Sequence, residues 1–250
     1  MNGPGHLPLP QLVGGACVEL QRNNQSFGQG ALCLVLNKQG NLVYLTCSHV
    51  AFGQYGPGAP PGTHAPGGHL LHPLINGGID IGTANAADDG LDQTLYPNYM
   101  DVAIVRPSGL GYPKPRTIYP DWTVIEVVMD IPSLKNKTVF KVGPDTGETT
   151  GIVLDFVPAG QDVATYGPLP NILIIEGVNN QPFAKEGDSG APIFMKIGAN
   201  PNLAALVGIV VAVDDPATVP NSVTAYAHPL AGVFVNEDGS SSGSLGLDRI

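Results

Sequence analysis

KEGDSGAPIF, residues 185–194, places an aspartate, a serine and two glycines directly before an apolar run. The glycines are typical of a tight turn, because glycine tolerates positive φ, and the apolar run is typical of a buried strand. Neither feature explains a serine held between an aspartate and a glycine. A serine in such a turn can act as a nucleophile only when a base and an orienting acid lie elsewhere in the fold.

A histidine and an aspartate that fit these two roles both lie upstream, beside apolar runs. His49 stands near the end of NLVYLTCSHV, residues 41–50, and Asp101 stands near the start of MDVAIVRP, residues 100–107. Alone, each is an ordinary residue at a strand end. Together with Ser189 they follow the chain order His, Asp, Ser, in which the histidine takes the serine proton and the aspartate holds the histidine tautomer.

The composition predicts an all-β protein. Of the 250 residues, 43% are apolar and only 13% are charged, and the chain holds 33 glycines and 24 prolines. Short apolar runs alternate with Gly, Pro, Asn and Asp clusters along most of the chain, and none keeps a helical period. We therefore expect many short strands, in one large domain or two smaller ones.

The charge and the termini restrict the expected partners. The formal net charge is −10, and no basic stripe could neutralise phosphates, so no nucleic acid partner is expected. The first residues lack the charged and apolar regions of a signal peptide, and the apolar runs are too short to span a bilayer. We therefore expect a cytoplasmic protein with no membrane partner. Its negative charge would attract a basic peptide or protein.

Four stretches resemble the trypsin-like serine proteases of the chymotrypsin fold. LTCSHV, residues 45–50, is similar to the segment of the catalytic histidine in that family, and DVAIV, residues 101–105, to the segment of the catalytic aspartate. GDSGAP, residues 187–192, is similar to the serine segment, with an alanine where many members have a third glycine. FKVGPDTGETTGIV, residues 140–153, is similar to a strand-turn-strand stretch of the bacterial branch. The resemblance extends over roughly residues 12–235.

The resemblance implies two antiparallel six-stranded β-barrels with the active site in the cleft between them. His49 and Asp101 would belong to the first barrel and Ser189 to the second. The implied activity is that of a serine endopeptidase, in which Ser189 attacks the scissile carbonyl, His49 transfers the proton and Asp101 orients His49. The backbone N–H groups of Gly187 and Ser189 would form the oxyanion hole. The partner would be a peptide or protein substrate, with no cofactor and no metal ion.

The proline-rich segment PSGLGYPKPRTIYPD, residues 107–121, is typical of a linker between two β units. The tail NEDGSSSGSLGLDRI, residues 236–250, is typical of a flexible segment. The expected organisation has five parts: an N-terminal extension (1–11), an N-terminal β-barrel (12–106), an inter-barrel linker (107–121), a C-terminal β-barrel (122–235) and a flexible tail (236–250).

Asp188 needs a charged partner, because an unpaired buried carboxylate is costly. In animal members of the family an N-terminus freed by cleavage supplies this partner, and LVGG, residues 12–15, is similar to such an N-terminus. In the bacterial branch a basic residue before the Gly-rich turn supplies it, and Lys141 holds that position. We favour the ion pair of Asp188 with Lys141, which predicts a chain that is active without cleavage before Leu12.

A narrower resemblance connects the chain with intracellular trypsin-like proteases of bacteria and plants. Four stretches support it: PLPQLVGGACVEL, GALCLVLN, LLHPLINGGIDIG and YPNYMDVAIV. Membership in that group would imply a regulatory enzyme that is coupled to a regulatory protein partner.

The family pattern also locates a pocket for the substrate side chain. The residue six positions before the serine usually forms its floor, and here it is Phe183, where trypsin-type cleavage needs an acid. In the wall strand, Ala212 and Val213 would narrow the pocket, and Val211 replaces a serine that touches the catalytic aspartate in many members. The resemblance therefore predicts a small or medium apolar P1 residue. Acidic residues near the cleft would instead favour basic residues at other subsites: Glu186, Asp214 and Asp215.

The remaining cysteines, histidines and acidic residues have ordinary explanations. The three cysteines are too few for a disulfide framework, and we favour reduced buried thiols over a Cys33–Cys47 bridge: Cys17, Cys33 and Cys47. Three histidines near a Pro/Gly loop are interpreted as solvated rather than metal-binding: His64, His69 and His72. Four acidic residues fit no known calcium loop: Asp80, Asp88, Asp89 and Asp92. No metal site is predicted.

Two other functions stay open. A pseudoprotease, or a peptide-binding module with the same fold, would recognise a peptide without cleaving it. A serine esterase or a self-processing protease would use the same triad on another substrate. The presence of His49, Asp101 and Ser189 together favours the active endopeptidase.

Overall fold

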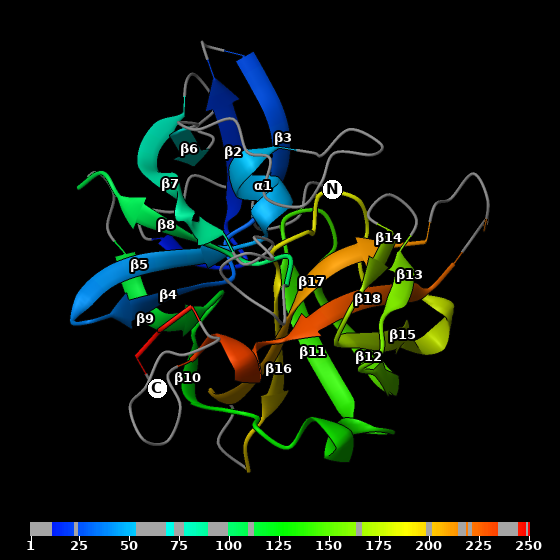
Figure 1. Ribbon diagram of the computed structural model, residues 1–250. Coiled ribbons are helices and arrows are strands. Elements are labelled where there is room, and N and C mark those ends of the chain that lie inside the picture. Colours follow the sequence, from blue (N-terminus) through cyan, green and yellow to red (C-terminus); the bar gives the residue numbers. More distant parts are fainter. Residues whose placement is uncertain are drawn as a thin grey trace.

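The structure is a computed structural model of the 250-residue chain. It describes residues 12–22, 25–53, 69–72, 78–89, 100–109, 113–163, 167–198, 202–214, 219, 222–234, 245–248 and 250. Two large β-sheets dominate these residues and form the two lobes of Figure 1. Within these ranges, no helix combines the length and the apolar content that crossing a membrane requires.

The first sheet has seven strands in the order β3-β2-β6-β7-β8-β5-β4, and all of its neighbours are antiparallel. The strands are β2 (Cys17–Arg22), β3 (Gln25–Ala31), β4 (Leu34–Lys38), β5 (Asn41–Thr46), β6 (His69–His72), β7 (Ile79–Asp89) and β8 (Ala103–Pro107). The short helix α1 (Ser48–Phe52) follows β5 directly. In the described part of the chain this sheet curls without a pairing between its outer strands β3 and β4.

The second sheet has nine strands in the order β1-β9-β10-β17-β16-β11-β12-β15-β18, and β18 pairs back with β17. The strands are β1 (Leu12–Gly14), β9 (Pro113–Ile118), β10 (Trp122–Val127), β11 (Thr138–Gly143), β12 (Gly147–Val157), β15 (Ile172–Gly177), β16 (Pro192–Lys196), β17 (Leu203–Val213) and β18 (Thr224–Pro229). The β17–β18 pairing closes six strands into a barrel. The predicted all-β, chymotrypsin-like class is confirmed, with one closed barrel and one curled sheet.

Smaller elements complete the chain. A separate hairpin joins β13 (Gln161–Val163) to β14 (Gly167–Leu169). Three 3₁₀ turns lie around the closed barrel: η2 (Ile131–Leu134), η3 (Val178–Asn180) and η4 (Leu230–Val233).

Two predicted boundaries differ from the structure near the proline-rich segment. Residues 113–118, expected in the linker, form β9, and Leu12–Gly14, expected in the first barrel, pairs with β9 in the second sheet. Among the described residues, β9 pairs with β10 through Thr117 and Ile118 alone. The prolines at the start of β9 therefore lose no hydrogen bond to β10, which explains how a proline-rich segment forms a strand.

The predicted flexible tail is partly fixed. Leu245 and Leu247 are buried, and Leu247 forms a parallel bridge with Phe234. The Asp248 carboxylate accepts hydrogen bonds from the backbone N–H groups of Gln39, at 2.9 Å, and Gly40, at 3.0 Å. Residues 245–248 are thus held against the turn between β4 and β5, while residues 235–244 lie outside the described residues.

The hydrophobic core connects the two sheets. One cluster contains Leu34 and Ile104 from the first sheet together with Phe194 and Leu206 from the second. Each fully buried side chain of this kind stabilises the fold by roughly 1.5–3 kcal/mol relative to its exposed state. The sheets are therefore packed against each other by a shared core.

The three cysteines are free thiols in the structure, and all are buried.

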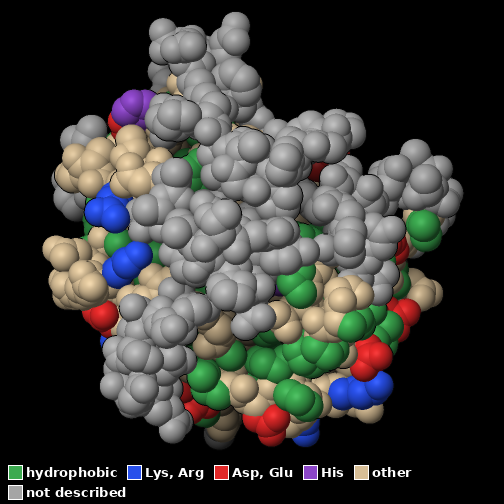
Figure 2. Space-filling view, in the orientation of Figure 1, with side chains coloured by type: hydrophobic (Ala, Val, Ile, Leu, Met, Phe, Trp, Pro, Cys, Tyr) green, Lys and Arg blue, Asp and Glu red, His purple; other side chains and the backbone are tan. Residues whose placement is uncertain are grey.

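On the face shown in Figure 2, the described acidic and basic side chains are scattered and do not gather into one charged surface.

Candidate active site

His49 and Asp101 meet because their strands are neighbours. His49 lies on α1 just after β5, and Asp101 lies just before β8, and the pairing of β5 with β8 brings Thr46 opposite Ala103. Nδ1 of His49 is 2.5 Å from Oδ2 of Asp101, and the backbone N–H of His49 donates to Oδ1 at 3.0 Å. Asp101 is fully buried and His49 is 7% exposed. Both carboxylate oxygens thus hold the histidine.

The electrostatics of this pair define its protonation. Burial raises the pKa of Asp101, but the charge and the hydrogen bonds of His49 outweigh burial and hold that pKa below its usual value. An ionised carboxylate can only accept a hydrogen bond, so Nδ1 of His49 carries a proton. In the neutral ring, Nε2 is then unprotonated and can accept a proton. This is the tautomer that a general base requires.

Ser189 lies in the turn before β16, and this turn is fastened to β17. The Ser189 hydroxyl donates to the carbonyl oxygen of Val211 at 3.1 Å, and the Gly190 N–H donates to the carbonyl oxygen of Val210 at 2.8 Å. The thiol of Cys47, two residues before His49, donates to the same Val210 carbonyl at 3.1 Å. The serine turn and the histidine segment therefore share one acceptor on β17.

Two glycines allow the serine turn to lie directly against the histidine segment. A Cβ on Gly190 would stand 2.8 Å from Oγ1 of Thr46, and a Cβ on Gly30 would stand 2.5 Å both from the Ser189 carbonyl oxygen and from Val50. Contacts this close do not occur for real side chains, so neither site tolerates a Cβ without movement. Since Thr46 and Val50 flank His49 in the sequence, the backbone of the serine turn lies against the segment that carries His49.

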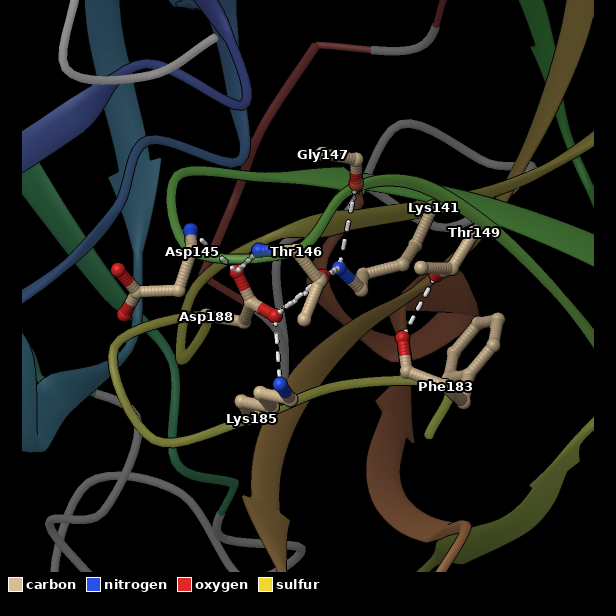
Figure 3. Close-up of polar contacts among 8 residues, drawn as sticks. All are labelled: Lys141, Asp145, Thr146, Gly147, Thr149, Phe183, Lys185 and Asp188. Atoms are coloured by element: carbon tan, nitrogen blue, oxygen red, sulfur yellow. Dashed lines mark hydrogen bonds and ion pairs between the residues drawn. The ribbon is translucent and has the colours of Figure 1, made fainter. Parts of the chain in front are cut away.

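Asp188 is the centre of a buried network, shown in Figure 3. Nζ of Lys141 lies 3.0 Å from Oδ2 of Asp188, and both side chains are fully buried. The same carboxylate accepts the Thr146 hydroxyl at 2.6 Å and the backbone N–H groups of Asp145 and Lys185, each at 3.0 Å. Lys141 also donates to the Thr146 hydroxyl oxygen. The structure thus gives Asp188 a complete set of partners.

The alternative partner for Asp188 is placed elsewhere. Leu12–Gly14 forms β1, with Leu12 opposite Pro113, so the LVGG segment is held in a sheet pairing.

Burial lowers the pKa of Lys141, and the negative charge of Asp188 opposes this effect. The carboxylate therefore supports the charged form of a lysine that has no contact with solvent.

The turn around Ser189 depends on two positive φ angles. Gly187 has φ 95° and Gly190 has φ 93°, a region that other residues rarely adopt. They bracket Asp188 and Ser189, so the two glycines allow the backbone to form this turn. The N–H groups of Gly187 and Ser189 remain our proposed oxyanion donors.

A half-open pocket of about 540 Å³ adjoins the serine turn. Its lining includes Ala184, Glu186, Val213, Asp214, Ser222 and Thr224. Of the predicted pocket residues, Val213 lies in this lining, whereas Val211 is buried and Phe183 is buried in the barrel core. A Cβ on Gly151 would lie 2.6 Å from the Phe183 ring, so the missing side chain at Gly151 gives the ring its space. The expected floor of the pocket is therefore a core residue.

The structure adds an acid with fixed geometry to this pocket. Asp214 accepts the Tyr226 hydroxyl at 2.7 Å and the Ser222 hydroxyl at 2.5 Å. Burial, followed by the hydrogen bond and charge of Asp214, raises the pKa of Tyr226 to about 12. Asp214 was expected near the cleft, but no sequence signal indicated Tyr226 or Ser222, because only the β17–β18 pairing brings them to Asp214.

A second histidine lies close to Asp101. His228 of β18 is fully buried, with Nδ1 3.3 Å from the Asn171 carbonyl oxygen and with no partner for Nε2 among the described residues. Burial lowers the pKa of His228 to about 4, although the negative charge of Asp101 opposes the shift. No sequence signal identified His228, because a single histidine on a strand is common.

Of the other histidines and acids that were considered as metal ligands, the structure describes the side chains of His69, His72 and Asp80. Exposed His69 pairs with Asp80 at 2.7 Å, and buried His72 contacts the Cys17 carbonyl oxygen at 2.8 Å. The positions or side chains of the others lie outside the described residues: His64, Asp88, Asp89 and Asp92. Asp215, which was expected near the cleft, also lies outside the described residues.

No family model and no curated protein matches the chain. Solved structures do match it. An alpha-lytic protease homologue, N4, has a TM-score of 0.55 at 14% identity over 88% of this chain and 93% of that chain. A glutamic-acid-specific serine protease has a TM-score of 0.54 at 17% identity over 87% and 92%. Cellulomonas bogoriensis chymotrypsin has a TM-score of 0.53 at 15% identity over 88% and 92%.

These likenesses show that the chain has the fold of the chymotrypsin-like serine proteases. They confirm, at the level of the fold, the resemblance first drawn from the sequence motifs. The bacterial branch and the narrower intracellular group remain predictions.

Proposed function

We propose that the chain is a serine endopeptidase that hydrolyses peptide bonds through an acyl-enzyme, with His49, Asp101 and Ser189 as its triad. The observation that carries the proposal is the buried His49–Asp101 pair, in which both carboxylate oxygens hold the histidine. The segment that carries His49 lies against the Ser189 turn, and the solved structures of similar fold are serine proteases, which supports the proposal.

The geometry supports a stepwise mechanism. The Ser189 hydroxyl proton points to the Val211 carbonyl and must turn to Nε2 of His49 before attack. His49 then takes this proton and later gives it to the leaving amine, while ionised Asp101 stabilises the imidazolium. The N–H groups of Gly187 and Ser189 would stabilise the oxyanion, and one such donor is typically worth about 10²–10³ in rate.

The pocket supports a revised expectation for the P1 side chain. An apolar residue was expected from Ala212 and Val213, yet the observed lining carries two acids and one base: Glu186, Asp214 and Lys185. Two hydroxyl groups fix the position of the Asp214 carboxylate in this lining, and a fixed carboxylate favours a cation or a hydrogen-bond donor nearby. We therefore propose that P1 residues with a basic or donor end are preferred over purely apolar ones.

A fluorophosphonate probe tests the activity directly, because it labels only a serine activated by its base. We expect labelling of the native chain and none of Ser189→Ala or His49→Ala. Ser133→Ala is the matched control, since Ser133 is an exposed serine whose hydroxyl donates to the Asp130 carbonyl. Labelling that survives in Ser189→Ala, or a folded native chain that resists the probe, would contradict the proposal. The second result would favour a peptide-binding module.

A further inference from the structure

A thiol, an imidazole and a carboxylate form one buried cluster in the first sheet. A ligand atom from each of Cys47, His49 and Asp101 lies within 4.8 Å of the other two, and in the described part of the chain these residues are the group that satisfies this condition. Cys47 and Asp101 have no exposed surface, and His49 is 7% exposed. The triad, as proposed above, uses the histidine and the aspartate but leaves the thiol without a role.

The position of the sulfur is set by both sheets. Cys47 precedes α1, so it is close to His49 in the chain, and its thiol donates to the Val210 carbonyl of β17 at 3.1 Å. This carbonyl also accepts the Gly190 N–H of the serine turn. The thiol is thus fixed beside the histidine from the side of the second sheet, and does not depend on a mobile loop.

We propose that Cys47, His49 and Asp101 form a binding site for a thiophilic divalent cation, of which Zn²⁺ is the best match. Thiolate sulfur, imidazole nitrogen and carboxylate oxygen are the three ligand types that zinc takes from proteins. Three protein ligands leave a fourth tetrahedral position for water. The site differs from a purely structural zinc site because its ligands also serve the proposed triad.

The observed distances show what must move when the cation binds. Tetrahedral bonds to zinc place a nitrogen and an oxygen ligand about 3.3 Å apart. Nδ1 of His49 and Oδ2 of Asp101 are 2.5 Å apart, so this contact must open. The Cys47 thiol must also turn from the Val210 carbonyl towards the histidine. Both adjustments are rotations of side chains.

Binding of the cation changes which nitrogen of His49 carries a proton. The Cys47 thiol releases one proton to solvent and binds as thiolate, and Asp101 binds as the carboxylate. The cation replaces the proton on Nδ1 of His49, and the neutral ring then carries its proton on Nε2. An imidazole protonated at Nε2 cannot accept the Ser189 proton. Inhibition by the cation therefore rests on the proposed function, whereas binding of the cation does not.

The binding test uses Cd²⁺ and Zn²⁺ with the full chain. Cd²⁺ bound to a thiolate gives an ultraviolet charge-transfer band, and we expect this band at one equivalent per chain. Cys47→Ser should abolish the band and weaken Zn²⁺ binding by roughly a hundredfold, because the soft ligand is lost. Cys17→Ser is the matched control, since Cys17 is also a buried free thiol, and it should keep the band. A native chain without the band, or Cys47→Ser with the native band, overturns the site.

A second variant tests the cation site even if Cys47→Ser does not fold. His49→Asn removes a ligand and keeps every cysteine, and it should weaken Zn²⁺ binding by more than about tenfold while the circular dichroism spectrum stays native. An unchanged Zn²⁺ affinity in folded His49→Asn overturns the proposal.

Fluorophosphonate labelling separates this proposal from the proposed function. Zn²⁺ should suppress labelling of the native chain and of Cys17→Ser, but the ratio of labelling with and without Zn²⁺ should stay near one in Cys47→Ser. A chain that gives the Cd²⁺ band and is never labelled supports the cation site and contradicts the protease. A chain that is labelled equally well at saturating Zn²⁺, and gives no Cd²⁺ band, supports the protease and overturns the cation site.

Discussion

Ala31 of β3 donates its backbone N–H to the carbonyl oxygen of Ser189 at 2.7 Å. This hydrogen bond joins the sheet that carries His49 and Asp101 to the turn that carries Ser189. The relative position of the three residues is therefore set by backbone contacts between the sheets, and not only by the side chains themselves. Substitutions of the triad side chains should change chemistry much more than folding.

Asp101→Asn should slow fluorophosphonate labelling by about 10⁴-fold while leaving the fold intact. The amide can donate to Nδ1 and so stabilises the wrong histidine tautomer. The measurement is the second-order rate of labelling, with circular dichroism as the check on folding. Asp80→Asn is the matched control, because Asp80 forms an exposed pair with His69 at 2.7 Å in the same sheet. Similar rates in both variants would refute the role of Asp101.

Lys141→Met should lower the free energy of unfolding by about 3–5 kcal/mol, because it leaves the buried Asp188 carboxylate without its cation. Labelling should fall as well, since Asp188 shapes the turn of Ser189. Urea unfolding measures the first effect and the probe measures the second. Lys135→Met removes an ion pair whose side chains are 57% and 51% exposed, and it should change stability little. Equal losses in the two variants would contradict this prediction.

His228 should make the protein sensitive to acid. Its pKa is about 4 in the folded chain, whereas an ordinary exposed histidine has a pKa of 6.5. Between these pH values the unfolded chain binds a proton that the folded chain does not, so stability falls as pH falls through this window. The loss is at most roughly 3 kcal/mol. Urea unfolding should show that the free energy of unfolding falls less between neutral and mildly acidic pH in His228→Gln than in the native chain. An equal fall in both chains would refute the role of His228.

Asp214→Asn should reduce the preference for basic over apolar P1 residues by roughly tenfold, about 1.4 kcal/mol. The substitution removes the charge but keeps an oxygen for one hydroxyl donor, so the pocket should retain its shape. Paired peptide substrates that differ only at P1 measure the ratio of kcat/KM values. Asp155→Asn is the control, because Asp155 of β12 is exposed and is not a lining residue of the pocket. A ratio that stays at the native value would show that Asp214 does not select the side chain.

Much of the site could be predicted because its chemistry demands particular residue types beside particular strands. A base, an acid and a serine in the order His49, Asp101, Ser189 are recognisable in the sequence, and the glycines around the serine indicate its turn. The cost of an unpaired buried carboxylate showed that Asp188 needs a partner, and the resemblance to the bacterial branch named Lys141. The structure pairs His49 with Asp101 and Lys141 with Asp188, whereas the assignment of Ser189 to the same triad stays a prediction.

The contacts that were not predicted depend on tertiary structure alone. Phe183 turns into the barrel core because Gly151 on another strand leaves room for its ring. His228 becomes a neighbour of Asp101 only when β18 closes the barrel. The tail was expected to be flexible from its composition, but Asp248 finds two backbone donors in a turn more than two hundred positions away, at Gln39 and Gly40. Local composition contains no signal for such distant partners.

The Lys141–Asp188 pair has a consequence for the timing of activity. Lys141 lies on β11 and Asp188 just before β16, and these neighbouring strands place Lys141 opposite Ile193. Both charges are supplied by one closed barrel, so they are in place as soon as that barrel has folded. Ribosomal synthesis, and not a second enzyme, then sets the moment at which this ion pair exists. Under the proposed function, a delay in activity would then require restricted access to Ser189 rather than a delayed ion pair.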